Sequence, residues 1–438
     1  MAVHRRDDGR PLHGALRRAH DRVLHARHGA GRRAPRSSAA RRGAVVGIVA
    51  TALFVATLVV LVYHYLGYPL TLAVLARLRR EAPVRPGAGT PSVTLIISAY
   101  NEESVLGAKL ENALSLDYPK DRLEIIVASD GSTDRTAEIA RGFVPAGVVL
   151  HEYRTNRGKN AALNDSVPQA RGDIVVFTDA NGMYRPDALR RLVAYFDDAR
   201  VGSVCGELLY LNYSRNPVAE GYGTYWRFDQ VQKRLESRCL TLLGANGSIF
   251  AIRKTLHRPL PNTVCNDMVL PILIAAAGHA VVYAPDAVSH EAGSADLREE
   301  LRRRSRIIAR GILGVRAVWS EVVGARRWLL AWELFWRKRV RYAMPFLLLA
   351  LLVSSAALAT PWNLLCLAQL AVYLAAPVAA LLPEGRLRRL GTPALYLGVG
   401  TLAALLAWVQ LVAGRDFSRW ETVARPHEQG MPSMRGTT

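Results

Sequence analysis

The chain has 438 residues, of which 50% are hydrophobic, and its formal net charge at pH 7 is +21. This length leaves room for one large domain with additional elements. The apolar residues gather in long, almost uncharged runs near the ~20 residues that a bilayer-spanning helix requires, a pattern that excludes an ordinary water-soluble domain. The runs cover residues 44–62, 343–360, 362–382 and 393–413. We therefore expect an integral membrane protein.

The first element is an Arg-rich basic tail over residues 1–43. It lacks the interleaved aromatic residues and the modules of nucleic-acid-binding proteins, so we expect no nucleic-acid partner. Because the tail adjoins an apolar run, attraction to anionic membrane lipids or plain disorder fits it better. A signal peptide is the competing interpretation of that run, but the long preceding tail and the lack of a convincing cleavage site speak against it.

Residues 44–80 form the N-terminal membrane segment, either as one span or as a hairpin interrupted at Gly67-Tyr68-Pro69. By the positive-inside rule the basic loop 384–389 and the segment before residue 343 are cytoplasmic. A single first span then places the basic tail outside, whereas a hairpin keeps it inside, and the sequence does not decide between them. The four scattered cysteines show no pairing or metal-ligand spacing, which suits a catalytic part in a reducing cytoplasm.

Three strand-like runs follow, and each ends in polar residues. Residues 92–98 lead to Tyr100-Asn101-Glu102, residues 123–129 to Asp130-Gly131-Ser132-Thr133-Asp134, and residues 173–178 to Asp179-Ala180-Asn181. A helix-like segment follows each tip. Taken alone, Asp130-Gly131-Ser132 is a sequence common in ordinary turns. Together the three tips indicate an α/β fold with an open, mostly parallel sheet, helices on both faces, and a ligand site at one edge.

The catalytic domain is expected at residues 91–310, an interfacial amphipathic helix region at 311–340, three transmembrane helices at 341–413 and a C-terminal tail at 414–438. Within the helix region, residues 326–337 carry four aromatic residues on one helical face among Arg and Lys, namely Trp328, Trp332, Phe335 and Trp336. That pattern suits a helix in the membrane interface. Packing on the catalytic domain is the alternative.

Six short motifs follow one another in the order seen in family 2 glycosyltransferases. They are Tyr100-Asn101-Glu102, Asp130 to Asp134, Gly158-Lys159-Asn160, Asp179-Ala180-Asn181, Gly244-Ala245-Asn246-Gly247 and Asn266-Asp267. The chain resembles the membrane-bound branch of that family, which is related to cellulose, chitin and hyaluronan synthases. The resemblance covers the catalytic domain and implies a GT-A-like α/β fold with transmembrane α-helices beside it.

The resemblance implies a nucleotide-sugar donor, which we expect to be a UDP-sugar. In the family the position of Tyr100 lies against the base, those of Glu102 and Asp130 contact the uridine, and that of Lys159 reaches the base or the phosphates. A Tyr ring offers a flat apolar surface, a carboxylate accepts the uracil imide proton, and an ammonium offsets phosphate charge. Alternatively, Asn101 and Glu102 begin a helix and Lys159 is a solvated helix residue.

Asp179-Ala180-Asn181 stands where the family carries Asp-x-Asp, which holds Mg2+ or Mn2+ against the diphosphate. Asn181 can coordinate a metal through its carbonyl oxygen but brings no charge. We therefore expect a metal that depends on Asp179, Asn181, the phosphates, water and a further ligand.

The family's catalytic base is the acidic residue of a Thr-Glu-Asp-like motif, and Asn266-Asp267 occupies that place. Asp267 is the expected base, which takes the proton of the acceptor hydroxyl while that hydroxyl attacks opposite the leaving nucleotide. Asn266 is expected near the acceptor, and Glu207 matches a position near the acceptor or the diphosphate. Helix capping is the alternative for Asn266 and Asp267.

Polymerising members of the family carry Gln-x-x-Arg-Trp where this chain has Arg303-Arg304-Ser305-Arg306-Ile307. Arg304 and Arg306 can still neutralise the donor's diphosphate. The aromatic platform associated with a growing sugar chain is missing, which weakens the expectation of processive synthesis. For Arg303, a solvated basic face near lipid is the alternative.

These features predict an inverting glycosyltransferase of the cell membrane with a cytoplasmic catalytic domain. It would transfer a hexosyl or N-acetylhexosaminyl group from the nucleotide sugar to a saccharide or lipid-linked acceptor, in the synthesis of a cell-surface polysaccharide or glycolipid. Two alternatives stay open. One is transfer to a polyprenyl phosphate, and the other is a catalytically inactive membrane scaffold, which Asn181 suggests.

Overall fold

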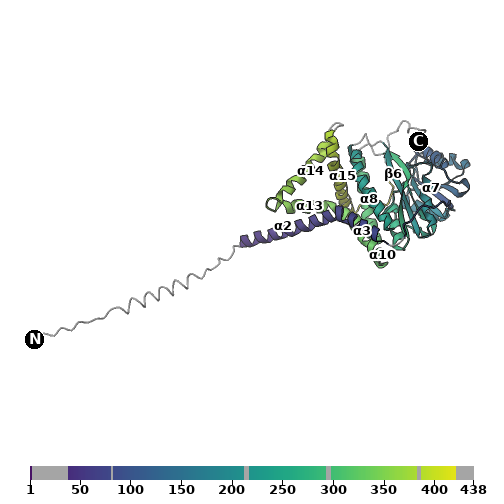
Figure 1. Ribbon diagram of the computed structural model, residues 1–438. Helices are drawn as coiled ribbons and strands as arrows, with labels where there is room; N and C mark the ends of the chain where they lie inside the picture. Colours follow the sequence, from purple (N-terminus) through teal and green to yellow (C-terminus); the bar gives the residue numbers. More distant parts are fainter. Residues whose placement is uncertain (2–37, 80–81, 212–216, 293–296, 382–385, 421–438) are drawn as a thin grey trace.

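The computed structural model describes residues 1, 38–79, 82–211, 217–292, 297–381 and 386–420. A sheet domain occupies one end of the molecule, and long helices extend from it toward the other end (Figure 1). Most of the basic tail, most of the C-terminal tail and the start of the loop 384–389 lie outside the described residues.

The sheet domain contains eight strands in the order β3-β2-β1-β4-β7-β6-β8-β5. Their bounds are β1 Val93–Ala99, β2 Leu123–Asp130, β3 Val148–Tyr153, β4 Ile174–Asp179, β5 Met183–Tyr184, β6 Val201–Leu211, β7 Phe250–Arg253 and β8 Ala280–Ala292. Strands β3, β2, β1 and β4 are parallel, as are β6 and β8. Strand β7 is antiparallel to β4 and β6, and β5 is antiparallel to β8. The open, mostly parallel sheet predicted from the three tips is confirmed.

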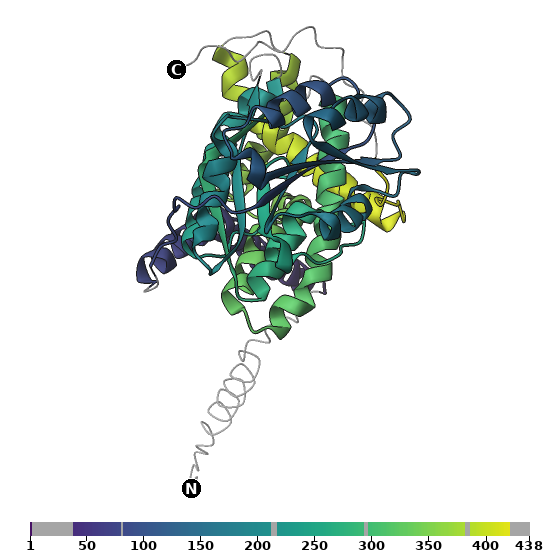
Figure 2. The same cartoon turned by 90° about the vertical axis from the view of Figure 1, so that its right-hand side faces the viewer.

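Helices cover both faces of this sheet (Figure 2). On one face they are α4 Leu106–Leu114, α5 Thr136–Gly142 and α7 Ala188–Val193; on the other they are α6 Lys159–Ser166, α9 Asn266–Ala276, α10 Leu297–Gly324 and α11 Trp328–Leu334. Successive residues of β1 alternate between the two cores, because Leu95 and Ile97 belong to one and Ile96 to the other. All of β1 is buried, as is typical of a parallel strand covered on both faces.

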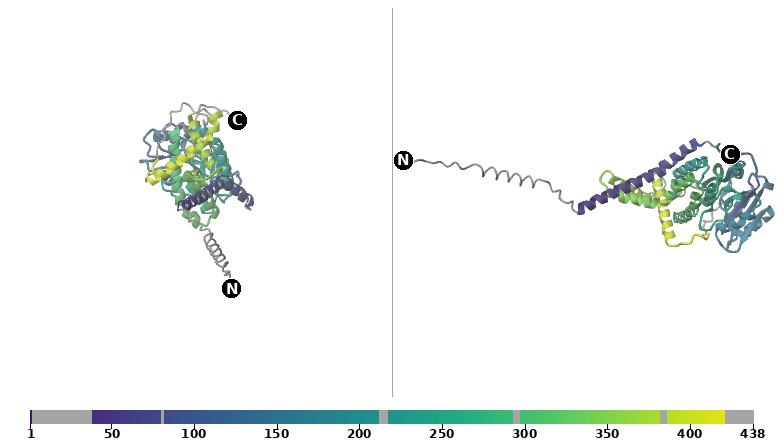
Figure 3. Two further views of the ribbon diagram at one scale, coloured as in Figure 1. Left: turned by 90° about the vertical axis from the view of Figure 1, so that its left-hand side faces the viewer. Right: turned by 90° about the horizontal axis from the view of Figure 1, so that it is seen from below.

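The N-terminal helix is continuous. It comprises α2 Ser38–Val62, the π-helical turn η1 Tyr63–Gly67 and α3 Tyr68–Leu78, and it lies against α13 (Met344–Ala356) (Figure 3). Of the two forms predicted for residues 44–80, the structure has the single helix, because Gly67 ends the π turn and Tyr68 and Pro69 begin α3 without reversing the chain. The hydroxyl of Tyr68 donates to Glu236 Oε1 at 2.9 Å, which joins this helix to α8 (Pro217–Arg238) of the sheet domain.

The C-terminal helices differ from three straight spans. They are α12 Val340–Tyr342, α13, α14 Asn363–Leu381 and α15 Arg386–Val412. Among the described residues, two helices are long and apolar enough to cross a membrane, Ala44–Leu78 and Ala394–Val412. A third exists only if Trp328–Tyr342 and Met344–Ala356 count as one, although they meet at 65°. Pro345 in the first turn of α13 explains the break, since proline begins a helix readily and cannot continue one.

The segment 326–337 packs on the sheet domain, the alternative predicted for it, and its position in the membrane interface stays a prediction. Leu330 and Leu334 are buried in the core of the sheet domain. Trp328 keeps 65% of its surface exposed. The next turn, η8 (Phe335–Arg339), buries Arg337, whose guanidinium contacts Asp229 Oδ1 at 2.7 Å and Glu236 Oε1 at 2.9 Å. These ion pairs fix the helices leading to the membrane segments on α8.

Candidate active site

A cavity of about 930 Å³ lies between the carboxyl edge of the parallel strands and the helices α10 and α15. It brings together residues predicted for the donor and for the reaction, namely Tyr100, Glu102, Lys159, Asp179, Asn181, Asn266, Asp267, Arg304 and Arg306. Its far wall includes residues of the candidate span in α15: Tyr396, Leu397, Gly400, Thr401 and Ala404. The cavity therefore reaches from the sheet to the helices expected in the membrane.

The tips of β1 and β2 hold each other in place. Asn101 has a positive φ of 53° and accepts the Thr133 N–H at 2.7 Å through Oδ1. The backbone N–H of Glu102 donates to Thr136 Oγ1 at 2.7 Å. The backbone N–H of Glu103 donates to Asp134 Oδ2 at 3.1 Å. Much of the two sequence motifs thus serves to shape the loops that present Tyr100 and Glu102 to the cavity.

Asp130 is fully buried and does not line the cavity. One carboxylate oxygen accepts the Arg157 N–H at 3.1 Å and the other accepts the Gly158 N–H at 2.7 Å. Gly158 has a φ of 100°, which favours glycine, and it directly precedes Lys159 at the start of α6. In this structure Asp130 fixes the turn that presents Lys159, and its predicted contact with the nucleoside remains a prediction.

Lys159 and Asp179 form an ion pair at the donor end of the cavity. The two side chains come from α6 and from the tip of β4, and they keep 13% and 32% of their surface exposed. An ammonium suits a diphosphate and a carboxylate suits a divalent cation. Lys159, expected to bind the diphosphate, and Asp179, expected to bind the metal, therefore lie side by side.

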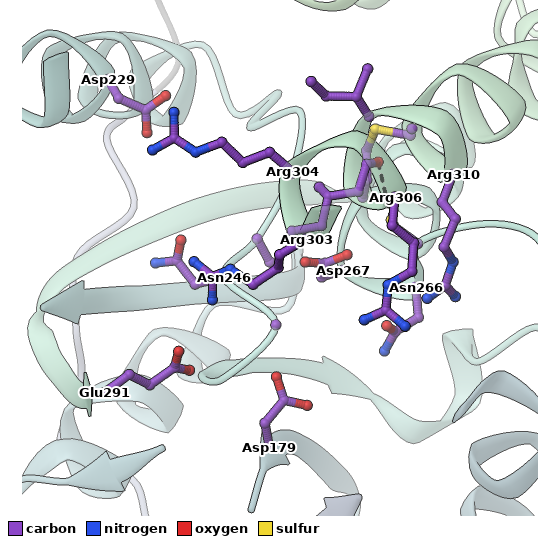
Figure 4. Close-up of a pocket in the computed structure, with 18 of the residues that line it drawn as sticks. Asp179, Asp229, Asn246, Asn266, Asp267, Glu291, Arg303, Arg304, Arg306 and Arg310 are labelled. Carbon is purple, nitrogen blue, oxygen red and sulfur yellow. Dashed lines mark hydrogen bonds between the residues drawn. The ribbon is translucent and has the colours of Figure 1, made fainter. Parts of the chain in front are cut away.

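Asp267 faces Asp179 across Gly247. A Cβ atom added at Gly247 would stand 3.2 Å from Asp267 Oδ2 and 3.6 Å from Asp179 Oδ2. Figure 4 shows both carboxylates directed toward the same space. The lack of a side chain at Gly247 therefore keeps open the position between the predicted base and the predicted metal ligand.

Burial raises the pKa of the Asp267 carboxyl above its ordinary value; the cation of Lys159 opposes this shift and the anion of Asp179 adds to it. A raised pKa makes a carboxylate a stronger base, which suits general-base catalysis. The position and surroundings of Asp267 therefore suit the role of base predicted for it.

An arginine cluster on α10 stands beside Asp267 (Figure 4). Arg304 donates to Glu300 Oε1 at 2.6 Å and lies 4.6 Å from the ring centroid of Tyr396. Arg310 donates to the carbonyls of Asn262 and Val264. Arg306 also lines the cavity. These cations create a positive wall next to the predicted base.

Residues 94–260 match the family model described as glycosyl transferase family 2. They form a family 2 glycosyltransferase domain. Over 167 residues the chain is 34% identical to a beta-monoglucosyldiacylglycerol synthase of Synechocystis sp., covering 37% of this chain and 35% of that protein. Over 116 residues it is 34% identical to a poly-beta-1,6-N-acetyl-D-glucosamine synthase of Staphylococcus aureus, covering 26% and 28%. The chain thus spans about a third of the length of these relatives.

The fold is also similar to that of a mannosyltransferase from Pyrobaculum calidifontis, solved in complex with GDP-Man and Mn2+. The TM-score is 0.60 at 25% sequence identity, and the match covers 83% of this chain and all of that one. Together with the sheet order, this similarity confirms the GT-A-like fold.

The cavity is also lined by Ser418, Arg419 and Trp420, which belong to a segment that the sequence analysis assigned to a tail. The ring of Trp420 lies 6.4 Å from that of Tyr100, and Lys159 Nζ is 5.9 Å from its centroid. Asn156 Nδ2 donates to the Trp420 carbonyl at 3.0 Å. Phe417 anchors the same segment by packing on Ala309 and Ala407. No short-range motif marks Trp420, although an aromatic residue in a polar tail was a usable signal.

The two predicted acceptor residues differ in position. Glu207 is buried, accepts a hydrogen bond from Gln230 Nε2 at 2.7 Å, and does not line the cavity. Asn266 lines it, and its buried Nδ2 has no hydrogen-bond partner within the part of the chain that the structure describes. Asn266 therefore offers a donor that a bound substrate can satisfy, whereas the position of Glu207 favours a structural contact.

The residues for a metal are few but chemically suitable. Within the described residues, no three His, Cys, Asp or Glu side chains gather closely enough to hold a metal ion on their own. Asp179 and Asn181 both line the cavity and both offer oxygen, the ligand atom that Mg2+ and Mn2+ prefer. Such a site fits a metal that completes its coordination with phosphate oxygens and water.

Proposed function

We propose that the protein is a membrane-bound inverting glycosyltransferase that uses a nucleotide sugar, with UDP as the nucleotide. It transfers the sugar to a hydroxyl of a saccharide or lipid-linked acceptor at the cytoplasmic side of the cell membrane. The observation that carries this proposal is the pair Asp179 and Asp267, which face each other across Gly247 in a single cavity.

The donor occupies the end of the cavity at the strand tips. Tyr100 and Trp420 provide aromatic faces for the base, and Lys159 offsets the diphosphate charge. Asp179 and Asn181 would hold Mg2+ or Mn2+, which neutralises the diphosphate as the leaving group departs. The sugar then lies toward Gly247.

The acceptor enters from the opposite side of Gly247. Asp267 takes the proton of its hydroxyl, the hydroxyl oxygen bonds to the anomeric carbon, and the bond from that carbon to the diphosphate breaks. Arg306 offsets negative charge on the departing nucleotide, and Asn266 Nδ2 donates to the sugar or the acceptor. Because attack and departure occur on opposite faces, the configuration inverts.

The wall formed by α15 favours an acceptor that is held in the membrane. Leu397, Gly400, Thr401 and Ala404 present no charge to the cavity, so an acyl or prenyl chain can lie against them while its head group reaches Asp267. A buried base is required for a hydroxyl acceptor, whereas a phosphate acceptor is already an anion. Asp267 therefore favours a hydroxyl over a polyprenyl phosphate.

The test is transfer by membranes that contain the protein, with radiolabelled UDP- and GDP-sugars and with Mn2+, Mg2+ or EDTA. We expect metal-dependent labelling of lipid extract or polymer from a UDP-sugar, and none from Asp267→Asn membranes. Labelling from GDP-sugars alone would overturn the choice of nucleotide. Label recovered only in an acid-labile polyprenyl phosphate would overturn the acceptor, and equal inactivity of both proteins across the whole donor panel would overturn the enzymatic function.

A further inference from the structure

Helix α4 carries a lysine where its pattern calls for an apolar residue. Its buried positions are Leu106, Lys109, Leu110 and Ala113, the spacing of one helical face turned toward the core. Lys109 is completely buried. Burying an ammonium is costly unless specific partners compensate it, so the partners of Lys109 indicate what it does.

Those partners bracket the loop Asp179-Ala180-Asn181. Lys109 Nζ donates to Thr178 Oγ1 at 3.1 Å, immediately before Asp179, and to the carbonyl of Gly182, immediately after Asn181. The ammonium also lies 4.2 Å from the ring centroid of Tyr184. The lysine therefore contacts both ends of the turn that carries the two candidate metal ligands.

The next turn of α4 holds the same region. Asn112 Nδ2 donates to the Tyr184 carbonyl at 2.9 Å, and Asn112 Oδ1 accepts the Tyr184 N–H at 2.8 Å. At its other end α4 starts from the nucleoside loop, since the Leu106 N–H donates to the Glu102 carbonyl at 3.0 Å. One short helix thus connects the part of the cavity expected to bind the base with the part expected to bind the metal and the diphosphate.

Burial lowers the pKa of Lys109 to about 7, and the carboxylates of Asp179 and Glu291, which both line the cavity, oppose this shift. The hydrogen bonds of Lys109 Nζ go to the loop itself, whereas the carboxylate of Asp179 is paired with Lys159 at the cavity.

We propose that Lys109 is a positioning residue that sets the geometry of the Asp179–Asn181 loop for the metal and the diphosphate of the donor. The inference rests on the proposed function. It goes further because it makes binding of the diphosphate, and not of the nucleoside, depend on Lys109, which positions the loop without touching the donor. With a single carboxylate in the loop, correct placement of Asp179 matters more than in a site with two.

The test compares binding of UDP in the presence of Mn2+ with binding of UMP in its absence, on detergent-solubilised full-length protein. Lys109→Met keeps the length of the side chain and removes the donor. We expect it to weaken UDP–Mn2+ binding by about 10- to 100-fold, the usual cost of losing a group that orients a metal ligand. We expect UMP binding to stay at the wild-type level. Binding of Mn2+ itself, followed by loss of the free-ion spin resonance signal with UDP present, should weaken in parallel.

Two further variants keep the test decisive. Thr178→Val removes one acceptor of the Lys109 ammonium with little change in shape, and should weaken UDP–Mn2+ binding in the same direction to a smaller extent. Lys254→Met is the matched control, because Lys254 Nζ also donates to a backbone carbonyl, that of Ala170, far from this cavity. This control variant should bind UDP–Mn2+ and UMP as tightly as the wild type.

Equal losses for UDP–Mn2+ and UMP in Lys109→Met, or unchanged UDP–Mn2+ binding, would overturn the inference. If Lys109→Met does not fold, Thr178→Val decides by the same two measurements. Wild-type protein that binds neither UDP nor GDP with Mn2+ would overturn the proposed function, and the inference with it. Wild-type binding without a selective loss in the variants would overturn the inference alone.

Discussion

The donor end and the membrane end of the cavity are built in different ways. At the donor end, Tyr100 follows β1, Asp179 ends the neighbouring parallel strand β4 and Lys159 begins α6, and hydrogen bonds join the tips of β1 and β2. At the membrane end, α10, η8 and α15 line the cavity from distant parts of the chain, and the buried ion pairs of Arg337 hold η8 on α8. The difference teaches that the sheet preorganises donor binding, whereas the acceptor side depends on how the membrane helices dock.

The largest effect is expected from removing the catalytic base, which should affect sugar transfer and spare nucleotide binding. Asp267→Asn should lower transfer by about 10²- to 10⁴-fold, the usual contribution of a general base, while nucleotide binding is retained. Asp286→Asn is the matched control, since Asp286 is an exposed residue on β8 outside the cavity. Transfer rates in membranes check both. A variant with near wild-type transfer would remove Asp267 from the chemistry.

A smaller effect is expected where the C-terminal segment reaches the donor end. Trp420→Ala should weaken binding of the nucleotide by roughly tenfold, since stacking of an aromatic ring on a base contributes about 1–3 kcal/mol. Trp328→Ala, which removes a largely exposed ring, should leave binding unchanged. Titration with UDP measures both. Equal affinities for the wild type and both variants would confine the nucleotide site to the strand tips.

The pH dependence of transfer should reflect the environment of Asp267. Because the base acts when deprotonated and its pKa is raised by burial, activity should fall as the pH drops through that raised pKa, above the range of an ordinary Asp. The rate of transfer at saturating donor, measured from acid to neutral pH, checks this. An acid limb in the ordinary Asp range would contradict the burial seen in the structure.

The smallest effect concerns stability. A carboxyl whose pKa is raised by folding stabilises the folded state when it is protonated, and this contribution is lost as the pH rises through the folded pKa. Asp267→Asn should therefore unfold at a slightly higher temperature than the wild type at neutral pH, and the gap should close as the pH falls. Thermal unfolding at several pH values measures it. A variant that is less stable at neutral pH would show that the charged Asp267 is well compensated.

The sequence predicts the donor end well because its residues stand at the tips of strands whose periodicity and order are local features. Tyr100, Asp179 and Asn181 were placed at one edge for this reason, Lys159 was added by the family resemblance, and the cavity contains all four. Asp130 shows the limit of such reasoning, since a carboxylate at a strand tip can bind backbone N–H groups as readily as a ligand. Its two hydrogen bonds to the turn before Lys159 are visible only in the structure.

The membrane end was harder to predict because its contacts join residues far apart in the chain. Hydropathy identifies the apolar runs, but it does not reveal that a helix bends before Pro345 or that η1 continues the N-terminal helix. Trp420 reaches Tyr100 only after α15 has returned the chain to the sheet domain. The pattern around Lys109, a charged residue on a buried helical face, was present in the sequence and required the fold to be interpreted.

The most direct test of the two-ended cavity measures nucleotide binding and transfer on the same two variants, Asp179→Ala and Asp267→Asn, in the presence of Mn2+. The account predicts that Asp179→Ala loses both binding of UDP and transfer, and that Asp267→Asn binds UDP like the wild type but does not transfer. If Asp267→Asn also fails to bind UDP, or Asp179→Ala binds and transfers normally, the division into a donor end and a reaction end is wrong.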